Sequence, residues 1–468
     1  MDVEMSREEG MSRGEEMAMA HNPENISIED LSALLQKSGI AGAGGAGFPT
    51  YAKLDKRADT IIMNCAECEP LLKLHRQLLE QNAYEITKTF HMLARCVGAK
   101  EAVIGIKKAY KRTIDALNGC IGEYPEMRLG LLDEIYPAGD EVVLIYEVTQ
   151  KALPPGGLPI ESGVAVFNVE TVYNIYKAVY LGRPVEDKLV SIVGEVEHPV
   201  TVRLPLGCTI EEAVRQAGEI TVKDPVFFVG GPMMGFEAGG LLPVTKTTNA
   251  VLVLPEDHLL VQRKRRKSSI DLKRAAAACC QCTMCTDLCP RHLLGHPIEP
   301  HKFMRAATCR DVQDPDIFLN TMFCSSCGLC ENFSCMQGLS PRSLIADYKS
   351  GLRAHKIKPP KVEAAPVAEE REYRKAPMVR LMARLDLAKY DKPAPMTEMT
   401  GVVRKVKLML SQHIGAPAVP VVREGDLVEK GQMIAEPAQG LSVAIHASVS
   451  GRVVEVTEKY VIIYNSSE

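Results

Sequence analysis

Between residues 58 and 190, short apolar runs alternate with amphipathic stretches. The runs TIIMN, EAVIGI, VVLIYEV and VAVFNV have the length and β-rich composition of buried strands, whereas residues 78–97 and 108–118 carry apolar positions at helical spacing. Alternating strands and helices are typical of α/β folds. The pattern predicts an α/β domain, preceded by a short helix that Ser27 caps and Gly39 ends.

Further patterns predict separate modules downstream. Residues 188–255 hold short strands around one helix, which opens with a capping box from Thr209 to Glu212 and ends at Gly218. Residues 400–464 alternate Val, Ile and Gly, which predicts a small all-β sandwich or barrel. The Pro-, Ala- and charge-rich stretch 356–377 predicts an extended linker. The expected organisation is a flexible tail at 1–24, an α/β domain at 25–187, a β-rich domain at 188–256, a cysteine-rich domain at 257–355, a linker at 356–399 and a C-terminal β domain at 400–468.

Composition narrows the function classes. The 55 Lys and Arg residues against 59 Asp and Glu give a net charge of −4, and there is no Trp, so nucleic acid is not an expected partner. No run approaches the roughly 18 apolar residues of a membrane helix, and the N-terminal sequence is too acidic for a secretory signal. We expect a soluble, cytoplasmic protein without a transmembrane segment.

Most of the 15 cysteines fall in two short runs. The first has the spacing C-x2-C-x2-C-x3-C before a proline, as in bacterial ferredoxins, and the second has C-x2-C-x2-C-x4-C. Two such runs predict two 4Fe-4S clusters with crossed ligands, since the last cysteine of each run serves the other cluster. The alternative is zinc, which also uses CxxC pairs. The predicted ligand sets are Cys279, Cys282, Cys285 with Cys335, and Cys324, Cys327, Cys330 with Cys289.

A glycine loop, Gly42-x-Gly44-x-x-Gly47, comes before the first predicted strand rather than after it. A lone GxGxxG is weak evidence for a dinucleotide site, and this position does not fit the usual Rossmann arrangement. The loop still offers bare backbone N–H groups for a phosphate or a flavin face, with Lys53 as a nearby cation. The alternative is a tight structural turn.

Four ordered motifs carry a family resemblance. GAGGAGFPTYAKL (42–54), MNCAECEP (63–70), YPAGDE (136–141) and FNVET (167–171) resemble the FMN-binding motifs of the flavoprotein subunit of respiratory complex I and of the Rnf complex C subunit. Residues 230–255 resemble an SLBB β-grasp domain. The C-terminal stretch from His413 resembles the barrel-sandwich domain that Rnf C subunits carry first, whereas here it comes last. This permuted order resembles the PduS-like cobalamin reductases of bacterial microcompartments.

The resemblance implies a multidomain α/β fold. Its parts are a Rossmann-like FMN-binding domain, an SLBB β-grasp domain, a helical ferredoxin-like two-cluster domain and a C-terminal barrel-sandwich hybrid domain. Phe48 is expected to stack on nicotinamide or adenine, and Ala43 and Ala66 stand where complex I has charged residues. The cofactor-binding residues that the resemblance implies are Gly42, Gly44, Gly47, Phe48, Lys53, Asn64, Glu67, Glu69, Gly139, Asp140, Glu141 and Asn168.

The implied function is an NADH-dependent oxidoreductase. Electrons would pass from NADH through FMN and two 4Fe-4S clusters to a one-electron acceptor, with cobalamin expected as the acceptor, inside a bacterial microcompartment. Shell proteins or a corrinoid adenosyltransferase-like enzyme would be partners. Two alternatives share these motifs, namely an Rnf-type C subunit and a ferredoxin-like scaffold without flavin activity.

Overall fold

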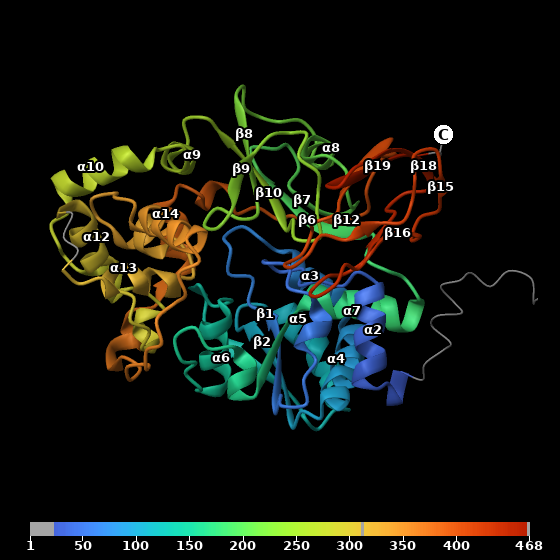
Figure 1. The fold of residues 1–468 in the computed structure, drawn as a ribbon, viewed down its shortest axis with the longest axis horizontal. Helices are drawn as coiled ribbons and strands as arrows, with labels where there is room; N and C mark the ends of the chain where they lie inside the picture. The colour runs from blue at the N-terminus through green and yellow to red at the C-terminus, as the bar shows by residue number, and fades with distance from the viewer. Residues whose placement is uncertain (1–22, 310–312, 466–468) are drawn as a thin grey trace, which may run out of the picture.

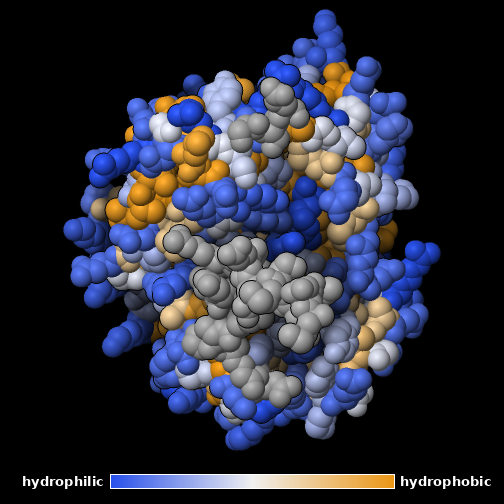
Figure 2. All heavy atoms as spheres, turned by 90° about the vertical axis from the view of Figure 1, so that its right-hand side faces the viewer, coloured by the Kyte–Doolittle hydropathy of each residue, from blue (hydrophilic) through white to orange (hydrophobic). Residues whose placement is uncertain are grey.

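The computed structural model describes residues 23–309 and 313–465 (Figure 1). The tail predicted for residues 1–24 lies almost wholly outside this range. Figure 1 shows the cysteine-rich region at one side of the molecule and the C-terminal domain at the other, with the β-grasp sheet and the N-terminal α/β domain between them. Figure 2 looks onto the side of the C-terminal domain, where hydrophilic residues predominate and hydrophobic ones are interspersed.

The N-terminal domain contains a four-stranded parallel sheet in the order β3-β2-β1-β5. Side chains alternate between its two faces, so Ile61 and Met63 join one hydrophobic core and Ile62 joins another. The predicted α/β domain is thus present. The strands are β1 (Thr60–Cys65), β2 (Glu101–Lys107), β3 (Met127–Leu132) and β5 (Val164–Asn168).

Helices cover both faces of this sheet. The first predicted helix is present as α2 (Ile28–Lys37), and the Ser27 hydroxyl accepts a hydrogen bond from the Asp30 amide at 3.0 Å. The helices that share the core of Ile61 and Met63 are α2, α3 (Leu74–Gln81), α4 (Ala83–Val97), α5 (Lys111–Ile121) and α7 (Val169–Leu181).

One predicted strand is wrong. The run VVLIYEV forms α6 (Glu141–Thr149), which packs on the face of Ile62. Asp140 caps this helix by accepting hydrogen bonds from the amides of Val142 and Val143 at 3.1 and 3.2 Å. A continuous apolar run suits a buried helix as well as a buried strand, so hydrophobicity alone could not separate them.

The β-grasp domain has a six-stranded mixed sheet in the order β12-β7-β6-β10-β8-β9. Its helix α8 (Ile210–Arg215) opens with the predicted capping box, in which the Thr209 hydroxyl accepts from the Glu212 amide at 3.2 Å and Glu212 accepts in return at 2.7 Å. The strands are β6 (Asp187–Gly194), β7 (Val200–Pro205), β8 (Pro225–Val229), β9 (Phe236–Ala238), β10 (Ala250–Pro255) and β12 (Met396–Thr397).

The cysteine-rich region is helical, and the C-terminal domain is built from two small sheets, β13-β19-β18-β15 and β14-β16-β17. The helices are α9 (Leu259–Lys264), α10 (Ser268–Ala278), α11 (Met284–Asp287), α12 (Pro300–Cys309), α13 (Asp316–Leu319) and α14 (Pro341–Ala354). The C-terminal strands are β13 (Lys405–Met409), β14 (Val419–Pro420), β15 (Leu427–Val428), β16 (Met433–Glu436), β17 (Ile445–His446), β18 (Gly451–Val456) and β19 (Tyr460–Asn465).

The segment 356–399, predicted as a linker, is folded over its second half. β11 (Ala376–Pro377) pairs with β4 (Ile135–Tyr136), and α15 (Met378–Arg384) buries Met378 and Leu381 in a core shared with the β-grasp sheet. The short strand β12 then extends that sheet. Apolar side chains in this segment therefore attach it to its neighbours. Of the helices in the described ranges, none is long and apolar enough to cross a membrane.

Candidate active site

A cavity of about 610 Å³ opens where the glycine loop meets the carboxyl ends of β1 and β5. From β1 the chain passes to β2 and β3 on one side, whereas β5 returns on the other side, so this is the point at which the strand order reverses. Open α/β sheets bind ligands at such a point. Asn64 and Asn168, at the ends of the two strands, line the cavity.

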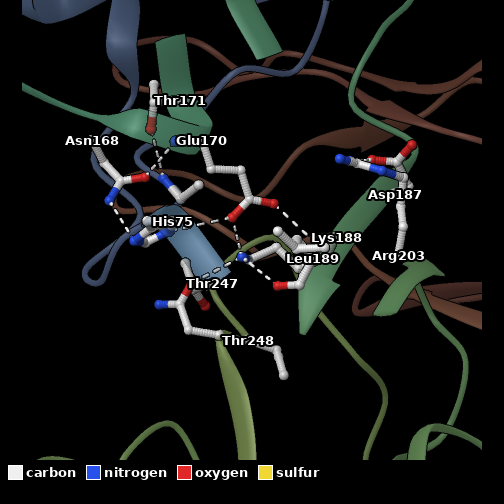
Figure 3. A network of polar contacts seen from close by, with 12 residues as sticks. His75, Asn168, Glu170, Thr171, Asp187, Lys188, Leu189, Arg203, Thr247 and Thr248 are labelled. Atoms are coloured by element: carbon white, nitrogen blue, oxygen red, sulfur yellow. Dashed lines mark hydrogen bonds and ion pairs between the residues drawn. The ribbon is translucent and has the colours of Figure 1, made fainter. Parts of the chain in front are cut away.

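Asn168 has a fixed orientation in the cavity wall. Its Oδ1 accepts a hydrogen bond from the Glu170 amide at 2.9 Å and so caps α7, which leaves the Nδ2 donor facing His75 Nδ1 at 3.5 Å (Figure 3). The Thr171 hydroxyl, one turn into the helix, accepts from the Ala43 amide in the glycine loop at 3.0 Å. The start of α7 therefore anchors the glycine loop and presents an amide donor beside it.

A buried charge network lies behind this wall (Figure 3). Glu170 pairs with Lys188 of β6, and both side chains are almost completely buried. Lys188 also donates to Asn249 Oδ1 at 2.8 Å, and the Leu189 amide donates to Glu170 Oε1 at 3.0 Å. Burial raises the pKa of Glu170, but Lys188 and His75 outweigh it and hold that pKa below its usual range. The network ties the cavity wall to the β-grasp sheet.

Close backbone approach explains two glycines of the loop. A Cβ on Gly44 would lie 2.5 Å from Asn168 Nδ2, so any side chain there would push into the cavity wall. Gly47 has a φ of +71°, in the left-handed region that favours glycine. Gly42, Gly44, Gly47 and Phe48 all line the cavity.

Lys53 supplies positive charge at the cavity. Its Nζ donates to the Val166 carbonyl at 2.9 Å and lies 3.6 Å from Glu141 Oε1. It also stands 5.9 Å from the centre of the Phe48 ring. Lys53 and Glu141 are thus brought together in the lining, with the lysine held in place by a backbone carbonyl.

Four predicted cofactor residues do not line the cavity, and each has another contact. Glu67 accepts from the His75 amide and from Arg76 Nε, both at 2.7 Å. The carboxylate of Glu69 accepts from the amides of Met233 and Met234 in the β-grasp domain at 3.0 and 2.9 Å.

The remaining two residues outside the lining are Gly139 and Asp140. The Gly139 carbonyl accepts from Asn64 Nδ2 at 3.0 Å. Asp140 caps α6 and pairs with Arg291 at 2.9 Å.

Several lining residues were not predicted. Asp55 and Arg57 form an ion pair at 2.6 Å in the lining, and residues 158–160 add an apolar edge. Thr171 is the last residue of the motif FNVET, so the resemblance to FMN-binding proteins could have indicated that it lies at the cavity. Ile414 comes from the C-terminal domain, and nothing local in the sequence connects it with the glycine loop.

The cysteines gather around two hollows in the ferredoxin-like region. Each hollow is lined by three spaced cysteines of one run and the last cysteine of the other, which is a crossed grouping, and Cys280 also lines the first hollow. Each set surrounds a hollow rather than a single point. The sets are Cys279, Cys282, Cys285 and Cys335, and Cys289, Cys324, Cys327 and Cys330.

The two sets differ in their surroundings. Cys330 is buried, whereas Cys282 of the other set is exposed; in both sets burial raises a thiol pKa, to about 11 for Cys289 and to about 12 for Cys285. The buried set adjoins the α/β domain, because the Tyr136 hydroxyl donates to the Cys327 carbonyl at 2.6 Å. Iron ligation requires the thiolate, so binding of iron must displace the thiol protons that burial otherwise favours.

Comparison with known proteins finds four family models that match successive parts of the chain. Residues 35–177 match the Nuo51 FMN-binding domain, 189–237 the SLBB domain, 278–340 the 4Fe-4S dicluster domain and 389–467 the RnfC barrel sandwich hybrid domain. The cobalamin reductase PduS of Citrobacter freundii is 40% identical over 92% of this chain and 95% of its own length. The chain belongs to the PduS cobalamin reductase family. PduS of Salmonella typhimurium is also 40% identical, over 94% of this chain and 97% of its own length.

A solved NAD⁺-reducing [NiFe]-hydrogenase chain is more distantly similar to this PduS family member. The identity is 19% and the TM-score 0.48, over 75% of this chain and 65% of the hydrogenase chain. The domain matches and the PduS relatives make the protein an oxidoreductase that transfers electrons with FMN and iron–sulfur clusters. The resemblance predicted from the motifs is confirmed, including the C-terminal position of the barrel-sandwich domain.

Proposed function

We propose that this PduS family member takes electrons from NADH and delivers them singly to cobalamin, inside a bacterial microcompartment. The observation that carries the proposal is the cavity at the switch point of the sheet, whose domain is joined through Tyr136 to one of two four-cysteine sets. When bound, FMN supplies the exchange between hydride and single-electron chemistry, and the clusters supply single-electron transfer. Shell proteins or a corrinoid adenosyltransferase-like enzyme are the proposed partners.

The residues at the cavity have separate proposed roles toward FMN. The bare backbone of Gly42, Gly44 and Gly47 allows close approach of a flat ring or a phosphate. Asn168 offers an oriented amide donor, and Lys53 places a cation beside the lining. Phe48 is positioned to stack on the incoming nucleotide. Together these groups bind and orient ligands and exclude water from the floor of the cavity.

The cysteine sets are the proposed iron ligands. Cys289, Cys324, Cys327 and Cys330 form the set next to the α/β domain. The other set, with Cys282 exposed, faces solvent and suits delivery to an external acceptor. Its remaining members are Cys279, Cys285 and Cys335.

The test is anaerobic purification with flavin, iron and sulfide analysis, followed by stopped-flow absorbance. We expect bound FMN and about eight irons per chain, the sum of two cubanes. On mixing with NADH, flavin bleaching should precede cluster bleaching, and cob(II)alamin or a one-electron dye should then be reduced. The absence of flavin bleaching with NADH and NADPH at millimolar concentration would contradict the proposed donor.

A further inference from the structure

The C-terminal domain reaches the glycine loop of the α/β domain. The Ile414 amide donates to the Gly47 carbonyl at 3.0 Å, and the Ile414 side chain lines the cavity while remaining 44% exposed. A Cβ added to Gly47 would lie 3.2 Å from the Gln412 carbonyl oxygen, so Gln412 also approaches this glycine closely. The glycine loop is therefore packed against residues 412–414 and has no room for a larger residue at this point.

A second loop of the C-terminal domain, residues 440–444, contacts the residues on either side of the glycine loop. Tyr51 donates its hydroxyl proton to the Gly440 carbonyl and accepts from the Ser442 amide, both at 3.3 Å. Gln36, near the end of α2, donates to the Ser442 carbonyl at 3.1 Å and accepts from the Ala444 amide at 3.1 Å. The C-terminal domain is thus fastened on both sides of the residues that form the cavity.

Lys246 of the β-grasp domain sits at the centre of this junction. Its side chain is 2% exposed, and its Nζ donates to the Gly39 carbonyl at 2.6 Å and to the Ala444 carbonyl at 2.9 Å. Its backbone amide donates to Gln412 Oε1 at 3.0 Å. One residue therefore connects the α/β domain, the β-grasp domain and the C-terminal domain directly behind the glycine loop.

The chemistry of this site suits an uncharged amine. In the described part of the chain, no carboxylate pairs with Lys246, and the titratable groups that face it are His413 and His446 of the C-terminal domain. Burial lowers the pKa of Lys246 to about 7 and, with the lysine charge, that of His446 to about 3; the pKa of His413 is lowered for the same reasons. A neutral amine has two N–H donors, and two carbonyls receive them, whereas protonation would place an unpaired charge in the interior.

We propose that the C-terminal domain forms one wall of the FMN site, and that Lys246 is the positioning residue that holds this wall against the glycine loop. The inference rests on the proposed FMN site. It adds that FMN affinity depends on the C-terminal domain, which is distant from the glycine loop in the sequence. Removing the lysine loosens residues 412–414 and the glycine loop together, so flavin affinity should fall even though no flavin contact has been removed.

The experiment measures the FMN dissociation constant of the full-length, anaerobically reconstituted protein by quenching of flavin fluorescence. Lys246→Met keeps the length of the side chain and removes the donors, and we expect at least a tenfold rise in the constant with iron content unchanged. Lys223→Met is the matched control, because Lys223 is an exposed lysine of the same domain. The FMN dissociation constant of this variant should stay within twofold of the wild-type value.

The pH profile separates positioning by the amine from a general packing effect. Protonation of Lys246 disfavours the docked arrangement, so the wild-type constant should rise as pH falls from 8 to 6. The FMN phosphate, with a second pKa of about 6, also titrates in this range, so the constant of Lys246→Met should keep a smaller pH dependence than that of the wild type. A pH dependence that persists unchanged in the variant contradicts the role of the amine.

Ile414→Ala tests the wall without changing the buried junction and covers the case in which Lys246→Met does not fold. We expect about a fivefold weaker affinity and a shifted flavin absorption band. If Ile414→Ala binds FMN with the wild-type dissociation constant, the C-terminal domain does not form a wall of the FMN site. If the wild-type protein itself binds no FMN, the proposed function is contradicted and this inference with it, whereas wild-type affinity in both variants contradicts this inference alone.

Discussion

Gly44→Ala tests the packing of the glycine loop with a single added methyl group. The new Cβ would lie 2.5 Å from Asn168 Nδ2 and 2.9 Å from its Cγ, well inside contact distance. Asn168 cannot turn away freely, because its Oδ1 accepts the capping hydrogen bond from the Glu170 amide. The methyl group must displace either the glycine loop or the oriented amide, and both line the cavity.

The expected loss can be worked out from this overlap. Overpacking of a fitted site costs about 1–3 kcal/mol. This cost falls on folding, and it reaches the FMN affinity only as far as binding pushes the relaxed loop and amide back to their fitted positions; since 1.4 kcal/mol corresponds to a factor of ten, the affinity should fall by up to about 150-fold. Gly119 in α5 gives a control away from the cavity, because a Cβ there would have no atom within 4 Å, and Gly119→Ala should leave the affinity unchanged.

The assay is FMN titration of both variants by fluorescence quenching, with iron content as the measure of intact cysteine sets. Asn168→Ala removes the two closest atoms that the methyl group meets, so the loss of affinity in the double variant should be smaller than the sum of the losses in Gly44→Ala and Asn168→Ala alone. Equal affinities for Gly44→Ala and Gly119→Ala would refute the reasoning, since only the first change brings a methyl group against the cavity wall.

Three further results are expected. Cys282→Ala should lose about half of the iron, whereas Cys280→Ala, next to the same hollow but outside the ligand spacing, should lose none; iron and sulfide analysis decides this. Glu170→Gln leaves Lys188 buried without its partner and should cost about 3–5 kcal/mol of unfolding free energy by denaturant titration. Because the pKa of Glu170 is lowered on folding, this difference from the wild type should be full above pH about 4.5 and shrink at lower pH. Chelation of the iron should lower the melting temperature without releasing FMN, because the cysteine sets and the cavity are separate.

The glycine loop and the three closely spaced cysteines of each set could be predicted from local spacing, whereas the fourth cysteine of each set was assigned from the ferredoxin pattern. Two-residue gaps determine which thiols face one hollow, and the GxGxxG pattern places Gly44 and Gly47 in one tight loop. The prediction of Asp140 was less successful. A motif identifies residues that stay together in a family, but it does not separate a residue that faces the cavity from one that caps the adjacent helix, as Asp140 does.

Long-range contacts account for what the sequence did not reveal. Lys246 reads as an ordinary lysine in a polar loop, and its burial depends on Ala444, which is 198 residues away. The linker prediction rested on Pro, Ala and charge, but the spacing of Met378, Leu381 and Leu385 is that of an amphipathic helix. The linker prediction relied on composition and passed over this periodicity. The β-grasp residues that pack against the helix are distant in the sequence, so the local sequence could not identify them.

The contact between Tyr51 and Ser442 joins residues 391 positions apart and has a consequence for synthesis. A ribosome that adds about 5–20 residues per second makes the C-terminal partner about 20–80 s after the glycine loop. During that interval the parallel sheet can form, but the loop lacks the domain that packs against it. Capture of flavin would then be a late, largely post-translational event, and translation that stops before the last domain would leave chains that hold iron ligands but retain flavin poorly.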